Sequence, residues 1–248
     1  MGDKIVNTTF DGTYRQTNLT NESAEYLAKR EELRLAEIEL MQQRERVAEM
    51  RRHLPEGAAI QDYEFEEGPR NLNAGDSPVT KVRLSELFTK PERALVIYHF
   101  MFGKKQAKAC PMCTMWLDGA NGIAHHLAQN VDFAVVAAAD VPTLRAFARE
   151  RGWDKLRLVS AANSTFKYDL GSENREGDQD STISVFTRDA KGNVRHFYSV
   201  HPRMSQEIKE RGIDLYAPVW HFLDLTPQGR GNWSASLAYG TKVNAAAK

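Results

Sequence analysis

The sequence of 248 residues contains only two cysteines, Cys110 and Cys113, and they are separated by two residues. This pair supplies no framework of structural disulfides, which argues against a small secreted disulfide-rich protein. An excess of one charge is also missing, because 33 lysines and arginines balance 33 aspartates and glutamates. We therefore expect neither nucleic acid nor an anionic membrane as a partner attracted by charge.

Long apolar runs are absent as well. No stretch of twenty apolar residues occurs, so the sequence predicts no helix that crosses a bilayer. Residues 1–7 lack the basic and apolar regions of a secretory signal, and Val6 stands where a myristoylation motif requires serine or threonine. These features lead us to expect a cytoplasmic protein.

The longest predicted element is a helix over residues 21–54, which are rich in helix formers and contain no glycine or proline. One seven-residue repeat of apolar side chains runs along it, consisting of Tyr26, Leu33, Leu40, Val47 and Leu54. The companion positions of the heptad are only half apolar, which is weaker than a committed coiled coil. Two interpretations stay open: packing along its own domain, or pairing with a second copy as a homodimer.

The cysteine pair stands between a predicted buried strand and a predicted helix. Residues 95–102 form an apolar, β-branched and aromatic run of the length of one central strand, and residues 103–109 interrupt it. At the N-terminus of the following helix, unpaired N–H groups and the helix dipole stabilise the thiolate form of a cysteine. We therefore expect Cys110 to attack a substrate and Cys113, one turn later, to resolve the mixed disulfide.

The remaining pattern predicts an alternation of strands and helices. A short edge strand near 63–65 and a strand near 82–84 precede the central strand, and a second central strand covers 131–138. Asp140 caps a helix that ends at Gly152, a third strand covers 156–160, and strands over 182–187 and 194–200 form a hairpin. A short helix over 204–211 follows. We expect an N-terminal extension (1–57), a central domain (58–225) and an irregular tail (226–248).

Metal binding is the main alternative to redox chemistry. A zinc site needs more ligands than two cysteines, and the adjacent His125 and His126 lack the spacing of a zinc finger. Two chains can instead combine their cysteines as a four-thiolate site. A further alternative is an interaction protein that binds a partner beside the cysteines without turnover.

A strand, CxxC and helix followed by a hairpin and a terminal helix resembles the thioredoxin fold. The strand and turn before the CxxC resemble the N-terminal additions of peroxiredoxin-like proteins. More narrowly, the sequence resembles the bacterial domain-of-unknown-function family numbered 899 from about residue 22 to 230. The motifs that carry this resemblance are Tyr98-His99-Phe100-Met101-Phe102-Gly103, Cys110-Pro111-Met112-Cys113 with Asp118, Gly152-Trp153, Ser184-Val185-Phe186 and Leu223-Asp224-Leu225-Thr226-Pro227-Gln228-Gly229-Arg230.

The resemblance implies an α/β protein with a central mixed sheet, built as βαβ and then ββα. It also implies a dithiol-disulfide oxidoreductase without a cofactor, which exchanges with a protein or small-molecule disulfide or thiol and with a separate electron donor. Thr182 occupies the place where thioredoxins have a cis-proline, and Ala109 replaces their tryptophan before the CxxC. Peroxiredoxins have threonine or serine where this chain has Ala107, so a conventional peroxidase is not expected.

Several neighbours of the cysteines are candidate supporting or substrate-binding residues. Pro111 suits the first turn of a helix because its missing N–H would have no partner there. Met112 lies between the cysteines, and Trp116 either shields the thiols and binds substrate or packs in the core. Thr182 completes this set. Trp220 and Arg203 fall in no motif and are left outside the expected site.

Overall fold

The computed structural model describes residues 19–207 and 211–238. The chain divides into two compact units, Met1–Leu54 and Pro55–Lys248. The three-part division expected from the sequence stays a prediction.

The first unit contains the long helix α1 (Ala24–Arg52). It begins after Ser23, whose hydroxyl accepts a hydrogen bond from the Tyr26 N–H at 3.1 Å, three residues later than expected. Ion pairs within the helix, such as Arg34 with Glu31 at 2.6 Å, lie on its surface. No residue of α1 is buried, and both interpretations of its apolar repeat stay open.

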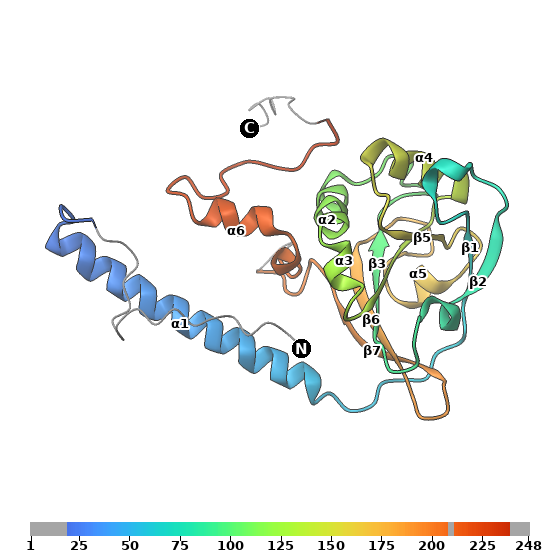
Figure 1. Cartoon of the computed structure of the whole chain (residues 1–248), viewed down its shortest axis with the longest axis horizontal. Helices are drawn as coiled ribbons and strands as arrows, with labels where there is room; N and C mark the ends of the chain where they lie inside the picture. The colour runs from blue at the N-terminus through green and yellow to red at the C-terminus, as the bar shows by residue number, and fades with distance from the viewer. Residues whose placement is uncertain (1–18, 208–210, 239–248) are drawn as a thin grey trace. The chain divides into compact units, whose positions relative to one another are not determined.

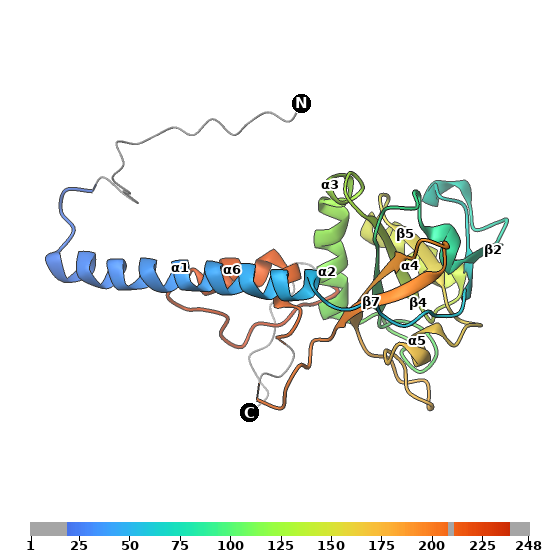
Figure 2. The same cartoon turned by 90° about the horizontal axis from the view of Figure 1, so that it is seen from below.

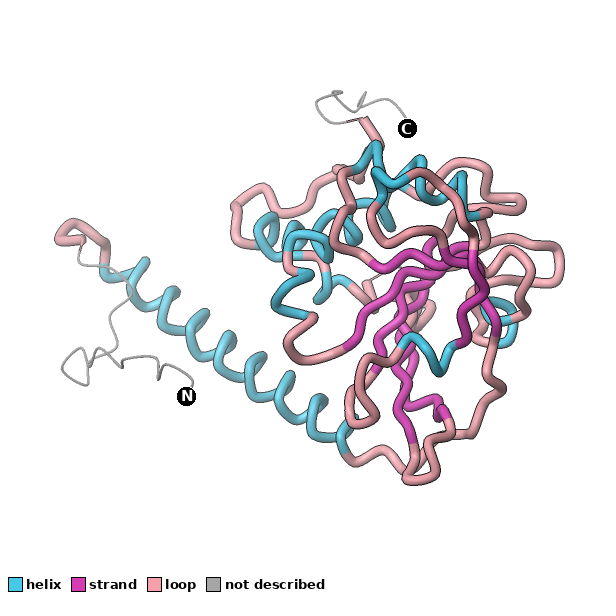
Figure 3. Tube along the Cα trace, turned by 45° about the vertical axis from the view of Figure 1, so that its right-hand side comes forward, coloured by secondary structure: helices cyan, strands magenta, loops and turns pink. Residues whose placement is uncertain are grey.

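The second unit is built on a seven-stranded sheet with the order β2-β1-β5-β4-β3-β6-β7 (Figures 1 and 3). Strands β3, β4 and β5 are parallel, whereas β6 runs antiparallel to β3 and β7 antiparallel to β6. The strands are β1 (Glu64–Glu67), β2 (Thr80–Arg83), β3 (Leu95–Phe100), β4 (Asp132–Ala137), β5 (Arg157–Ser160), β6 (Thr182–Arg188) and β7 (Val194–Val200).

The order β4-β3-β6-β7, with a helix between β3 and β4, is that of the thioredoxin fold, so the predicted fold class is confirmed. Strands β5, β1 and β2 extend the sheet beyond β4. The strand expected at the edge near residues 63–65 is covered on its outer side by β2, because β1 pairs with both β2 and β5.

Helices α2 to α5 lie between strands in the chain, and α6 follows the last strand. They are α2 (Pro111–Gly122), α3 (Ala124–Leu127), α4 (Val141–Arg151), α5 (Phe166–Asp169) and α6 (Pro218–Asp224), with 3-10 turns η1 (Leu72–Ala74), η2 (Leu84–Leu87) and η3 (Asp214–Tyr216). Helix α2 continues through Gly119 and ends at Gly122, and Ile123 separates it from α3. The helix expected over 204–211 is not formed at 204–207, and residues 208–210 lie outside the described part.

Strand β3 is buried on both faces, and its side chains alternate between two cores. Tyr98 and Phe100 pack on the face that carries α2 and α4, whereas Leu95 and Ile97 pack on the opposite face with Phe166. Figure 2 views the sheet from below, with α2 standing beside it. The cysteine-bearing helix thus packs directly on a buried central strand.

The chain turns back sharply after β3, and Gly103 makes the turn possible. Its φ of 106° lies in the region that side chains rarely adopt, and a Cβ there would lie 2.0 Å from the Ala139 nitrogen. Gly103 and Gln106 exchange backbone hydrogen bonds of 2.8 and 2.9 Å, and the Cys110 N–H donates to the Met101 carbonyl at 3.1 Å. This loop returns Cys110 to the end of β3.

Candidate redox site

Cys110 is the N-cap of α2, and Pro111 is the first residue of the helix. The Cys110 sulfur accepts a hydrogen bond from the Cys113 N–H at 3.4 Å. The N–H and hydroxyl of Thr114 both donate to the Cys110 carbonyl at 2.9 Å, which fixes the first turn. Neither cysteine forms a disulfide, and the two lie one helical turn apart.

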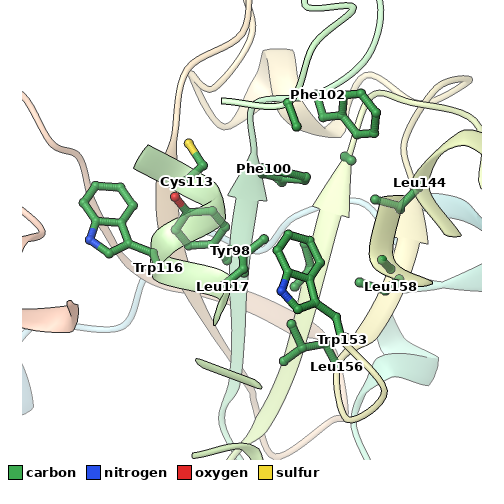
Figure 4. Packing of buried hydrophobic residues seen from close by; sticks show 14 of the residues in the cluster. Tyr98, Phe100, Phe102, Cys113, Trp116, Leu117, Leu144, Trp153, Leu156 and Leu158 are labelled. Carbon is green, nitrogen blue, oxygen red and sulfur yellow. The ribbon is translucent and has the colours of Figure 1, made fainter. Parts of the chain in front are cut away.

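The two thiols differ in their surroundings. Cys110 is half-buried, whereas Cys113 is only 1% exposed. Burial, and secondarily the neighbouring Cys110, raise the pKa of Cys113 well above its ordinary value, while the Tyr98 side chain and the Met101 backbone oppose this shift. Figure 4 shows Tyr98 beneath Cys113, with its hydroxyl end toward the cysteine. Burial and then Cys113 raise the pKa of Tyr98 as well.

A cavity of about 160 Å³ opens beside the cysteines. Its lining is apolar except for Ser181 and an ion pair between Asp180 and Arg203. The full lining consists of Met101, Cys110, Met112, Cys113, Trp116, Asp180, Ser181, Pro202, Arg203 and Trp220. The indole nitrogens of Trp116 and Trp220 are buried and have no hydrogen-bond partner in the described part of the chain.

Most of the site residues expected from the sequence meet at this cavity. Cys110, Cys113, Met112 and Trp116 line it together, and Trp116 also belongs to the core. A role of Trp116 toward the thiols or a substrate stays a prediction. Pro111 is exposed at the first turn of α2 and does not line the cavity.

Thr182 is also absent from the cavity lining. Its side chain is fully buried, and its hydroxyl lies 2.9 Å from His201 Nδ1. The preceding residue, Ser181, lines the cavity instead. Neighbouring residues of a strand point to opposite faces of the sheet. If the alignment to the cis-proline position is wrong by one residue, Ser181 takes the place expected for Thr182. A supporting role of Thr182 stays a prediction.

Trp220 and Arg203 were outside the expected site and are part of the cavity wall. Trp220 belongs to α6, about one hundred residues beyond the CxxC in the sequence. The Arg230 guanidinium lies 4.9 Å from the centre of the Trp220 ring and forms ion pairs with Asp214 and Asp224, which hold α6 in place. Only the tertiary fold brings these residues to the cysteines.

Lys167, on α5, is a further residue that no sequence pattern indicated. Its side chain is completely buried, and its Nζ donates a hydrogen bond of 3.3 Å to the Phe100 carbonyl. Burial lowers the pKa of Lys167 to about 7, and the strongest opposing effect comes from Cys113. The sequence around it, Ser164-Thr165-Phe166-Lys167-Tyr168, resembles an ordinary polar loop and gave no signal.

His99 is a hydrogen-bonded core residue. Its Nδ1 lies 2.6 Å from the Ser172 hydroxyl and its Nε2 lies 3.0 Å from the Ser184 hydroxyl. Ser172 donates its own proton to the Lys167 carbonyl, so it accepts from Nδ1–H, and His99 is neutral. Burial, and then the nearby Lys167, hold the pKa of His99 well below its ordinary value.

Asp118 lies away from the thiols. Its carboxylate accepts hydrogen bonds of 2.8 Å from Arg151 and from the Trp153 indole N–H, so it joins α2 to α4. In Figure 4, Trp153 lies well apart from Cys113.

The described residues contain no group of three or more histidine, cysteine, aspartate or glutamate side chains arranged to hold a metal ion. His125 and His126 lie on α3 and are exposed. Within residues 19–207 and 211–238, every helix is too short or too polar to cross a bilayer.

Residues 15–244 match the family described as "Bacterial protein of unknown function (DUF899)". The match covers most of the chain, and the chain therefore belongs to this family, as the motifs around Cys110 and Gly103 indicated. No curated protein matches the sequence.

Among solved structures, the chain is similar to several peroxiredoxins. A PrxQ mutant from Xylella fastidiosa has a TM-score of 0.46 and 12% identity, covering 68% of this chain and 98% of that chain. The antioxidant protein (1-Cys peroxiredoxin) of Plasmodium falciparum has a TM-score of 0.44 and 14% identity, covering 64% and 88%. Peroxidoxin BcpB from Mycobacterium tuberculosis has a TM-score of 0.42 and 19% identity, covering 66% and 95%. Likeness at this level says nothing about chemistry, and the fold assignment above comes from the strand order.

Proposed function

We propose, for a chain that belongs to this bacterial family, that Cys110 and Cys113 catalyse thiol-disulfide exchange. The Cys110 thiolate attacks a substrate disulfide, forming a bond to one substrate sulfur while the other leaves as a thiolate. Cys113 then loses its proton and attacks the Cys110 sulfur, which releases the second substrate thiolate. Two electrons pass from the protein dithiol to the substrate, and a separate dithiol reductant restores the pair.

The observation that carries this proposal is the asymmetry of the pair. Cys110 lines an open cavity at a helix N-terminus, where the dipole favours a thiolate, whereas Cys113 is buried directly behind it. A nucleophile needs access to substrate, and a resolving thiol needs access only to the first sulfur. Both requirements are met by two residues in one helical turn.

The cavity favours a particular class of substrate disulfide. Apolar side chains surround the sulfurs. A substrate with an apolar group beside the disulfide suits this lining. Trp220 and α6 form one wall, which favours a small disulfide or an extended peptide over a flat protein surface. A cytoplasmic location belongs to the same proposal, since a reducing compartment supplies electrons to the pair.

Two cysteine variants test the proposal against a small aromatic disulfide. Cys113→Ser is expected to accumulate a mixed disulfide on Cys110, seen as an added mass, because nothing resolves it. Cys110→Ser is expected to lose turnover almost completely, because Cys113 is buried. Turnover that survives Cys110→Ser would reject the assignment. If both variants behave like the wild type and the protein binds metal through its thiols, the metal-binding alternative takes its place.

A further inference from the structure

A second cavity, of about 180 Å³, lies at the end of the sheet opposite to the cysteines. Asp132, the first residue of β4, and Arg157, the first residue of β5, are in its wall. Asp132 pairs with Leu95 at the start of β3, whereas Cys110 is bonded to Met101, just beyond the end of β3. The two ends of β3 are about 16 Å apart. No residue lines both cavities, so the second one is separate from the redox site.

The wall of this second cavity carries more positive than negative side chains. Arg70, Lys155 and Arg157 line it, whereas Asp132 is the one carboxylate among the lining residues. One oxygen of Asp132 lies 3.6 Å from Nε of Arg93, which stands behind the wall. The charge of Asp132 is therefore balanced by Arg93 and leaves the three lining cations uncompensated.

A second carboxylate, that of Glu67, is shared between two of the lining cations. Both of its oxygens accept hydrogen bonds of 2.9 Å from the Arg157 guanidinium. Nε of Arg70 lies 3.3 Å from one of the same oxygens. Lys155 forms no ion pair with any residue in the described ranges. One negative charge thus serves two guanidinium groups, and the ammonium group has none.

The cavity as a whole therefore has an excess of positive charge. Four cations stand against two carboxylates when the two groups just behind the wall are included, which leaves two positive charges. The complete chain has no net charge, so this excess is local. A concave surface lined by charge of one sign concentrates ions of the opposite sign. Arginine side chains are particularly suited to the oxygens of phosphate, which they bind in pairs.

The remainder of the wall is mostly apolar. Phe133 is only partly buried and faces the cavity together with Leu87 and Leu156. An inorganic ion would leave this surface in contact with water. A ligand that joins an anionic group to an apolar group uses both parts of the wall.

We propose that this cavity binds a small organic phosphate. Its dianionic group lies among Arg70, Lys155 and Arg157, and its carbon skeleton lies against Phe133 and Leu156. A phosphate ester brings two negative charges in one compact group, which matches the two uncompensated positive charges. This binding does not involve the cysteines and is independent of the exchange reaction proposed for them.

Calorimetric titration with three probes tests the proposal at constant ionic strength. Phenyl phosphate carries both groups, inorganic phosphate lacks the apolar one, and phenol lacks the charge. We expect phenyl phosphate to bind with a dissociation constant of about 1 mM or lower, and each of the other two to bind at least about tenfold more weakly. No binding of phenyl phosphate at about 10 mM, or equal binding of phenol, would overturn the proposal.

Substitutions of exposed cations locate the binding. Arg70→Gln and Lys155→Gln each remove one lining charge at an exposed position and are expected to weaken phenyl phosphate binding about tenfold. Lys191→Gln is the matched control, because it removes an exposed charge from the turn between β6 and β7 and is expected to keep the wild-type affinity.

Two results of these substitutions would overturn the proposal. One is an affinity that both Arg70→Gln and Lys155→Gln leave unchanged. The other is an equal loss in Lys191→Gln, which would show that phosphate responds to the overall charge of the protein and not to this cavity. Cys110→Ser is expected to bind phenyl phosphate as the wild type does, so a failure of the exchange reaction leaves this test valid.

Discussion

The residues that distinguish this site are a half-buried thiol, a buried thiol and a buried amine near the end of one strand. Cys113 and Lys167 are both unfavourable in their charged forms alone, because each is removed from water. Because the pKa of Lys167 is lowered on folding, this residue also makes the stability of the protein depend on pH.

Lys167→Met is therefore expected to change how stability depends on pH. The pKa of Lys167 is about 7 when folded, against 10.5 for an ordinary lysine, so between these pH values the unfolded chain holds a proton that the folded chain lacks. Wild-type stability thus gains up to about 1.4 kcal/mol per pH unit in this window from this group. The advantage of Lys167→Met in urea unfolding is expected to be largest below pH 7 and to shrink toward pH 10.5.

An exposed lysine provides the comparison for this measurement. Lys155→Met removes the same charge from the surface and is expected to give a stability curve parallel to that of the wild type. If the curve of Lys167→Met is also parallel, Lys167 is not neutralised on folding.

At the scale of elements, the sequence predicted correctly the helix ends that are set by neighbouring residues. The Asp140 cap, whose carboxylate accepts from the Thr143 N–H at 2.9 Å, and the left-handed Gly152 at the end of α4 are both confirmed. The CxxC at the mouth of α2 was also predictable, because a strand, a break and a helix surround it within thirty residues.

What the patterns could not predict depends on contacts between distant segments. Ser181, Arg203 and Trp220 reach the cavity beside the cysteines from other parts of the chain, and nothing in their own neighbourhoods marks them. The helix expected over 204–211 has helix-forming residues, but propensity alone stabilises so short a helix only weakly. Residues of this kind can be identified only from a structure, which gives their burial and their distances from the cysteines.

The loop after β3 gives a prediction at this scale. Gly103→Ala is expected to destabilise the second unit by about 2 kcal/mol or more in urea unfolding, because a Cβ adds a collision with Ala139 to an unfavourable φ. Gly75→Ala is the control: its φ of 79° is also positive, but a Cβ there meets nothing within 4 Å. It should cost only about 1 kcal/mol. If both variants lower the free energy of unfolding equally, the close approach of Gly103 to Ala139 does not add to the cost of a side chain at Gly103.

At the scale of the whole molecule, we propose that α1 pairs two copies of the chain through its apolar repeat. Leu33 and Leu40 are about half exposed in the single chain and belong to this repeat. The wild type is expected to sediment at twice the chain mass of 28.0 kDa, and Leu33→Lys with Leu40→Lys at the mass of one chain. Leu35→Lys, outside the repeat, should remain dimeric. A monomeric wild type, or a dimer that survives both changes, would contradict the pairing.

A redox titration tests the central claim, that the cysteines exchange electrons. The purified protein is equilibrated in thiol buffers, its free thiols are counted by mass after alkylation, and bound metal is assayed on the same sample. We expect one two-electron transition, with a Cys110–Cys113 disulfide forming between about −300 and −120 mV, and no stoichiometric metal. Stoichiometric zinc or iron on thiols that resist oxidation would contradict the proposed chemistry and leave a metal site on a thioredoxin-like fold.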